Sequence, residues 1–96
     1  MAYLLAKSTR QSKKYSVKTP TGKTIHFGAT GYGDFTTHKD LERQRSYLAR
    51  HSPRENWTKS GINTAGFWSR WLLWNKKFLS SSIEDVERKF NIEITT

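Results

Sequence analysis

Three histidines and three carboxylates are the residues of this chain whose types could support catalysis or hold a metal ion. The segment DFTTHKD places Asp34, His38 and Asp40 close together, as a metal-dependent nuclease could require. On a helix, however, side chains two positions apart point about 200° away from each other, so His38 and Asp40 would not converge on one ion. We therefore expect no enzyme, no catalytic residue, no metal site and no cofactor, with a nuclease as the weaker alternative. The full set considered is His26, His38, His51, Asp34, Asp40 and Glu42.

Positive charge is the second chemical feature of the sequence. The chain has 17 Lys and Arg against 8 Asp and Glu, a formal net charge of +9, and residues 1–33 contain no acid at all. Such a balance implies an acidic partner: nucleic acid, an anionic membrane surface or an acidic protein surface. The residues predicted to bind this partner are Lys7, Arg10, Lys13, Lys14, Lys18, Lys23, Arg43, Arg45, Arg50 and Arg54.

A glycine-rich segment, GATGYGDF, lies between these two groups of bases. Gly28, Gly31 and Gly33 predict a loop whose backbone bends sharply or closely approaches a neighbour. The segment lacks the Lys-Ser/Thr pair of a phosphate-binding P-loop and the spacing of a dinucleotide-binding fingerprint. We therefore expect no small-molecule substrate.

The segment NTAGFWSRWLLWNKK, residues 63–77, contains three of the four tryptophans. It predicts a helix over residues 63–75, begun by Asn63 or Thr64, that is apolar around more than half of its circumference. Core packing explains part of this surface, but the apolar side chains exceed what a small fold covers easily. Tryptophan and arginine dominate protein interfaces. The residues expected to dock a partner are Trp68, Arg70, Leu73 and Trp74.

The remaining elements follow from periodicity and turn residues. Alternation around TPTGK predicts a β-hairpin over residues 13–30. A second helix is expected to begin at Thr37, in a capping box with Asp40, and to end at Pro53. A third is expected to begin at Ser81 or Ser82, and NIEITT could add a short strand to the hairpin.

These elements predict an α+β fold in which a small N-terminal β-hairpin, joined or not by a C-terminal strand, packs on three helices. Residues 1–13 are expected to form a basic N-terminal arm and residues 14–96 a single small domain. The hydrophobic fraction is 34%, which supports only a thin core. No apolar run approaches the roughly 18 residues that span a bilayer, so no membrane span is expected.

The run GDFTTHKDLERQRSYLARHSPRENWTKSGINTAGFWSRWLLWNKK resembles small, basic, mostly uncharacterised proteins of nucleocytoplasmic large DNA viruses of the iridovirus, marseillevirus and phycodnavirus kinds. The resemblance covers roughly residues 14–92, and its most distinctive part is TAGFWSRWLLWNK. It implies a virus-encoded protein that forms part of the virion, and it transfers no catalytic residue.

Charge and resemblance together favour a non-enzymatic minor capsid or cement protein that bridges larger capsid subunits. The alternative is a DNA-binding or genome-packaging protein without sequence specificity. The expected partners are accordingly larger virion proteins or viral DNA. The expected location is the virion and, during assembly, the viral factory in the host cytoplasm.

Overall fold

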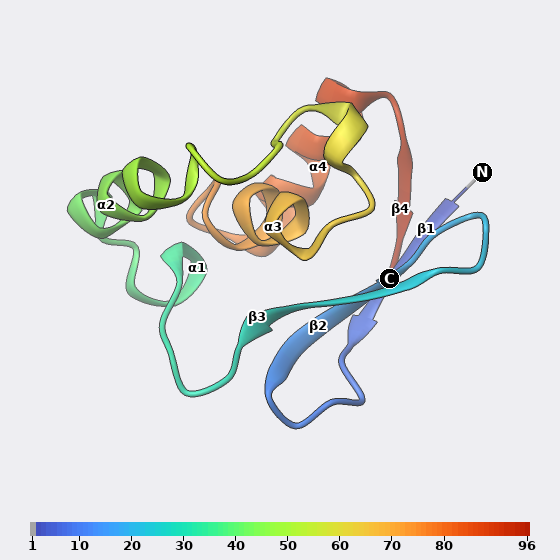
Figure 1. Cartoon of the computed structure of the whole chain (residues 1–96), viewed down its shortest axis with the longest axis horizontal. Coiled ribbons are helices and arrows are strands. Elements are labelled where there is room, and N and C mark those ends of the chain that lie inside the picture. The colour runs from blue at the N-terminus through green and yellow to red at the C-terminus, as the bar shows by residue number, and fades with distance from the viewer. Residues whose placement is uncertain (1) are drawn as a thin grey trace.

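A four-stranded β-sheet and a layer of helices make up the fold of residues 2–96, the part of the chain that the computed structural model describes (Figure 1). The α+β class expected from the sequence is confirmed. The strands are β1 (Ala2–Lys7), β2 (Lys13–Lys18), β3 (Thr24–Ala29) and β4 (Glu93–Thr95). The helices are α1 (Phe35–His38), α2 (Leu41–His51), the 3-10 turn η1 (Lys59–Gly61), α3 (Ala65–Trp68), the π-helical turn η2 (Ser69–Leu73) and α4 (Leu79–Phe90).

The strands lie in the order β3-β2-β1-β4. β2 is antiparallel to both β1 and β3, whereas β4 runs parallel to β1. The predicted hairpin is therefore present as β2 and β3. The predicted C-terminal strand also exists, but it extends the sheet beside β1 and does not touch the hairpin.

β1 takes the place of the basic arm expected over residues 1–13. Leu5 pairs with Val17 of β2 and is buried, and the ring of Tyr3 lies 5.6 Å from that of Trp68. The arm prediction is thus wrong for residues 2–13, which form a strand, a turn and the start of β2; Met1 lies outside the described residues. The arm was predicted from the lysines and the arginine of this segment, whereas the alternation of Tyr3 and Leu5, which indicates a strand, is short.

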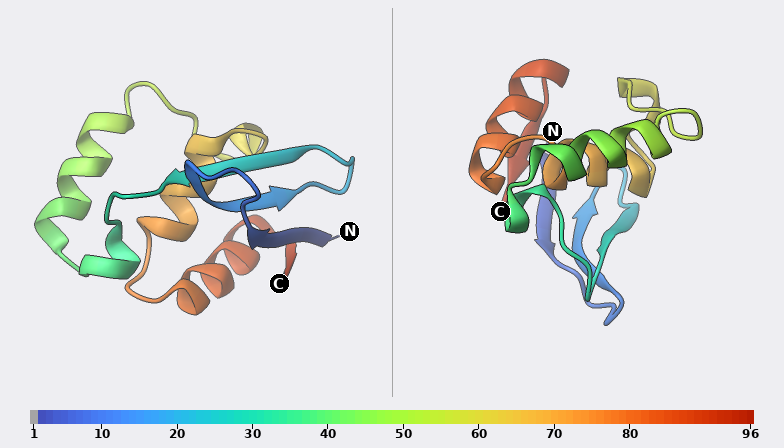
Figure 2. Two further views of the ribbon diagram at one scale, coloured as in Figure 1. Left: turned by 90° about the horizontal axis from the view of Figure 1, so that it is seen from below. Right: turned by 90° about the vertical axis from the view of Figure 1, so that its left-hand side faces the viewer.

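One face of the sheet carries the core. Val17 and Phe27 of the strands belong to one hydrophobic cluster with four buried side chains of α3 and η2: Phe67, Trp68, Leu72 and Leu73. α4 packs on the outer side of η2 and against β4. The helices thus lie on one side of the strands, and α2 lies on the far side of the molecule from β4 (Figures 1 and 2).

Two short helices replace the single one expected from Thr37 to Pro53. Asp34 begins α1 with a capping box in which Thr37 is the third helical residue, and Asp40 begins α2 by accepting from two backbone N–H groups. Lys39 lies between them in the left-handed region, with φ 54°. The prediction that Thr37 begins the helix is therefore wrong, because two aspartates upstream and downstream of it cap separate turns.

The tryptophan-rich helix is continuous from Ala65 to Leu73, and Thr64 begins it as expected. Its second half widens, so that the N–H of Trp74 donates to the carbonyl of Ser69, five residues back, at 3.1 Å. α4 begins at Leu79 and not at Ser81 or Ser82. Ser82 is fully buried and its hydroxyl accepts from the backbone N–H of Lys76, which ties the loop before α4 to that helix.

No helix of the described residues combines the length and the apolar character that a bilayer span requires.

Candidate nucleic-acid interface

The predicted basic residues lie in three regions. Lys18 and Lys23 flank the β2–β3 turn, and Lys23 donates to the carbonyl of Asn63 at 3.2 Å. Lys7, Arg10, Lys13 and Lys14 lie around the β1–β2 turn at the opposite end of the hairpin. The remaining members lie on α2 or just after it: Arg43, Arg45, Arg50 and Arg54.

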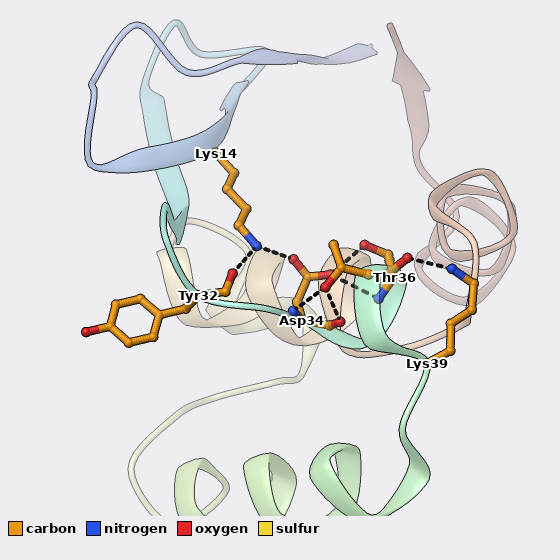
Figure 3. Close-up of polar contacts among 6 residues, drawn as sticks. Lys14, Tyr32, Asp34, Thr36 and Lys39 are labelled. Carbon is orange, nitrogen blue, oxygen red and sulfur yellow. Dashed lines mark hydrogen bonds and ion pairs between the residues drawn. The ribbon is translucent and has the colours of Figure 1, made fainter.

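Lys14 is engaged inside the protein. Its ammonium donates to Oδ2 of Asp34 at 2.6 Å and to the carbonyl of Tyr32 at 2.6 Å (Figure 3). Asp34 is only 3% exposed, and its other oxygen accepts from the backbone N–H of Thr36 at 2.9 Å. Through these two bonds Lys14 anchors the glycine-rich loop to β2. Because its charge is neutralised by Asp34, Lys14 is a poor candidate for contact with a partner.

The glycine-rich loop and α2 enclose a pocket of about 620 Å³, which we call the α2 pocket. Two arginines on the same side of α2, Arg43 and Arg50, line it together with Ser46. The loop contributes Tyr32, whose side chain is 76% exposed and points away from the Lys14–Asp34 pair (Figure 3). The complete lining is Tyr32, Gly33, His38, Asp40, Glu42, Arg43, Ser46, Arg50 and Trp74.

His38 brings a hydrogen-bond donor to the α2 pocket. Its Nδ1 accepts from the backbone N–H of Asp40 at 3.0 Å, so in the neutral ring the proton lies on Nε2. That Nε2 atom is buried and has no hydrogen-bond partner within residues 2–96. A buried donor without a partner costs free energy, which a ligand acceptor would recover only if a shift of the ring or of the loop exposed this atom.

A row of four aromatic rings lies beside the α2 pocket, and two of them, Trp74 and His38, line it. Trp74 lies parallel to Tyr47 with 4.3 Å between ring centroids, and His51 stacks on the other side of Tyr47 at 4.2 Å. His38 closes the row at 5.3 Å from Trp74. Burial raises the pKa of Tyr47 above its usual value, and the negative charge of Glu55 adds to the rise. Tyr47 therefore keeps its proton at physiological pH.

A second pocket of about 300 Å³ shares Tyr32, Gly33 and Trp74 with the first. It contains two carboxylates, Asp34 and Glu55. Asp34 is paired with Lys14, and Glu55 accepts from Nε1 of Trp57 at 2.8 Å and lies 3.3 Å from Nδ1 of His51. Both acids thus hold the fold together. Within residues 2–96, no group of three or more His, Asp or Glu is placed to hold a metal ion.

The residues expected to dock a partner are mostly interior. The expected exposure of Trp68 and Leu73 is wrong: they are 0% and 2% exposed, because the helix that carries them lies between the sheet and α4. Trp74 is half-buried in the row of rings. Arg70 lies with its guanidinium carbon 4.2 Å from the ring centroid of Trp71 and donates to the carbonyl of Trp74 at 3.2 Å. Burial lowers the pKa of Arg70.

Sequence reasoning missed Tyr32 and Ser46 as members of a site, and it considered His38 only for catalysis or metal binding. The three glycines around Tyr32 were the one available signal, because they predict a backbone that closely approaches a neighbour. Gly31 indeed has φ +83°, in the region that favours glycine. The closure of this loop onto α2 depends on tertiary packing and has no signature in local spacing.

Residues 3–51 match the model of a family of unknown function, DUF5754. The match covers about half of the chain, from β1 to the end of α2, and the chain belongs to this family. It includes every residue that lines the α2 pocket except Trp74. No curated protein and no solved structure matches the chain.

Proposed function

We propose that this member of the DUF5754 family is a non-enzymatic protein that binds nucleic acid through the phosphate backbone, without reading sequence. The observation that carries the proposal is uncompensated positive charge. Of the 17 Lys and Arg, only Lys14, Arg43 and Arg88 form ion pairs within residues 2–96, and the Arg43 pair is long, at 3.7 Å. Free cations on a small domain attract polyanions and release counterions on binding.

The interface is proposed to follow the exposed side of α2 and to reach the β1–β2 turn. Arg43 and Arg50 lie at the rim of the α2 face that buries Tyr47, where both line the α2 pocket, and Arg54 follows in the turn after the helix. Lys13 lines the neighbouring pocket beyond the glycine-rich loop. Phosphates spaced along a strand could therefore meet cations on both sides of that loop.

A minor capsid or cement role remains a second proposal. It lost its main support with the burial of Trp68 and Leu73, but Leu4 on β1 and Phe78 before α4 are large hydrophobic side chains that stay exposed. Such residues could contact larger virion proteins while the bases meet acidic neighbours. Both proposals place the protein in the virion and in the viral factory of the host cytoplasm, following the resemblance of the sequence.

Salt-dependent binding to duplex DNA of arbitrary sequence tests the first proposal. The logarithm of the binding constant should fall linearly with the logarithm of salt concentration, with a slope of about −0.9 per phosphate contacted. Replacing Arg50 and Arg54 by Gln should make the slope shallower by about 1.8. The matched control replaces Lys18 and Lys23 by Gln, which removes the same charge at the distant end of the hairpin.

Absence of binding at about 50 mM salt would exclude the nucleic-acid proposal. An equal effect of the two double variants would place the interface elsewhere. Recovery of the protein with the shell of purified particles, and not with the nucleoprotein, would favour the minor capsid proposal.

A further inference from the structure

We infer that the α2 pocket binds one unpaired nucleotide of a single strand, its base against Tyr32 and its phosphate at Arg43 and Arg50. The inference rests on the proposed nucleic-acid function and adds a preference for unpaired strands. The volume of about 620 Å³ falls within the range of about 300–1,000 Å³ typical of sites for small organic groups. The pocket also contains the three kinds of group that a nucleotide requires: an aromatic face, a hydrogen-bond donor and cations.

Tyr32 provides the aromatic face. It is the most exposed of the large hydrophobic side chains within residues 2–96. Its backbone carbonyl accepts a hydrogen bond from the ammonium of Lys14, which holds the loop in place. A base stacked on this ring would cover apolar surface that water now contacts. Stacking of this kind tolerates every base, which suits a protein that does not read sequence.

His38 provides the donor. Its buried Nε2–H has no acceptor inside the described part of the protein, while its ring is held by Trp74 and by the N–H of Asp40. Base edges carry ring nitrogens and carbonyl oxygens that accept such a bond. Because this nitrogen is closed off from solvent, with Gly33 packed beside the ring, an acceptor on a base reaches it only after the ring or the glycine-rich loop shifts.

Arg43 shares the first turn of α2 with the acids of the pocket and pairs with Asp40 at 3.7 Å, whereas no acid of the lining lies near Arg50 along the helix. Asp40 and Glu42 lie at that turn, near His38, whereas Ser46 and Arg50 lie one and two turns further on. A phosphate would lie between Arg43 and Arg50, on the side of Arg43 away from Asp40, where both arginines and the hydroxyl of Ser46 can donate to its oxygens. The acids then face the base, whose amino groups can donate to carboxylates.

A paired base is a poor ligand for this pocket. Entry of a base from a duplex requires that it leave the stack and lose its partner, whereas a base in a single strand carries no such cost. The same residues should therefore bind single strands more tightly than duplexes of equal length at the same salt concentration.

The test uses fluorescence anisotropy to compare a labelled single-stranded oligonucleotide of mixed sequence with a blunt-ended duplex of two complementary strands of the same length, which has no unpaired base. Tyr32→Ala should weaken binding of the single strand by about tenfold or more and leave duplex binding unchanged. Phe78→Ala is the matched control, because Phe78 is an exposed aromatic residue, 61% accessible, that does not line the α2 pocket. It should change neither affinity. Both variants should keep the far-ultraviolet circular dichroism and the unfolding midpoint of the parent protein.

Equal binding of single strand and duplex, with no effect of Tyr32→Ala, would overturn the pocket inference and leave backbone binding in place. Failure of both nucleic acids to bind at low salt would instead remove the proposed function on which it rests. A free mononucleotide that competes as well as the oligonucleotide, at equal concentration of nucleotides, would show that the pocket does not require a strand. The ligand would then be a small molecule.

Discussion

Asp34 joins three parts of the molecule through one carboxylate. It caps α1 through the backbone N–H of Thr36, accepts from the hydroxyl of the same residue and pairs with Lys14 of β2 (Figure 3). Lys14 in turn holds the carbonyl of Tyr32. The geometry of the glycine-rich loop, and with it the placement of Tyr32, therefore depends on an acid that is nearly inaccessible to solvent.

Replacement of Asp34 by Ala should lower the free energy of unfolding by about 2–4 kcal/mol. A lost helix cap accounts for about 1 kcal/mol, and the uncompensated ammonium of Lys14 adds less than a fully buried charge would, because 20% of that side chain is accessible to water. Urea denaturation measures the change. Asp40→Ala is the control, since Asp40 caps α2 but is exposed, and it should cost only about 1 kcal/mol. Equal losses in the two variants would show that the ion pair contributes nothing.

α2 is attached to the rest of the fold through a small set of side chains on one face. Tyr47 stacks on Trp74, and the amide of Gln44 donates to the carbonyls of Trp74 and Asn75 at 3.0 and 2.9 Å. These contacts connect α2 to the end of η2, where the π-helical turn presents the carbonyl of Trp74. The position of α2, which forms one side of the α2 pocket, thus depends on the stacking of Tyr47 on Trp74 and on the two hydrogen bonds of the Gln44 amide.

The buried hydroxyl of Tyr47 makes this attachment sensitive to alkali. Its pKa is raised by burial, so between pH 10 and the folded-state pKa the unfolded chain loses a proton that the folded protein keeps. Stability should therefore fall as pH rises above 10, by about 1.4 kcal/mol per pH unit from this group. Tyr47→Phe should remove that part of the slope in urea denaturation at pH 9.5 and 11, whereas Tyr32→Phe should not. Identical slopes in all three proteins would refute the assignment.

How far the sequence predicts these elements depends on how local their signals are. The β2–β3 hairpin follows from alternation around TPTGK, and Thr64 is recognisable as a cap from its position before AGFW. The break between α1 and α2 is not predictable in the same way, because Asp34, Thr37 and Asp40 all suit a helix start. The burial of Trp68 and Leu73 depends on the sheet on one side and α4 on the other. An amphipathic pattern does not contain that information.

At the scale of the whole molecule, the first residues of the chain contribute to the interior of the sheet as well as to its charge. β1 pairs with β2 on one side and with β4 on the other, so it brings the C-terminal strand into the sheet. Ile94 of β4 is buried beside it, and its N–H donates to Glu87 of α4 at 3.0 Å. β1 is thus an interior strand that lies between the β2–β3 hairpin and β4.

Removal of residues 1–12 distinguishes a strand from an arm. An arm could be deleted with loss of charge alone, whereas loss of β1 removes Leu5 from the core, frees both of its neighbouring strands and exposes Trp68 to water. Burial of a leucine side chain is worth about 1.5–3 kcal/mol, a large share of the stability that a domain of this size can have. The truncated protein should therefore lose its cooperative unfolding transition and shift its tryptophan emission to longer wavelength. Lys7→Gln with Arg10→Gln, which removes the same charge and keeps the strand, should fold normally and change only the salt dependence of DNA binding. A truncated protein that unfolds cooperatively at the parental midpoint would show that β1 adds nothing to the core.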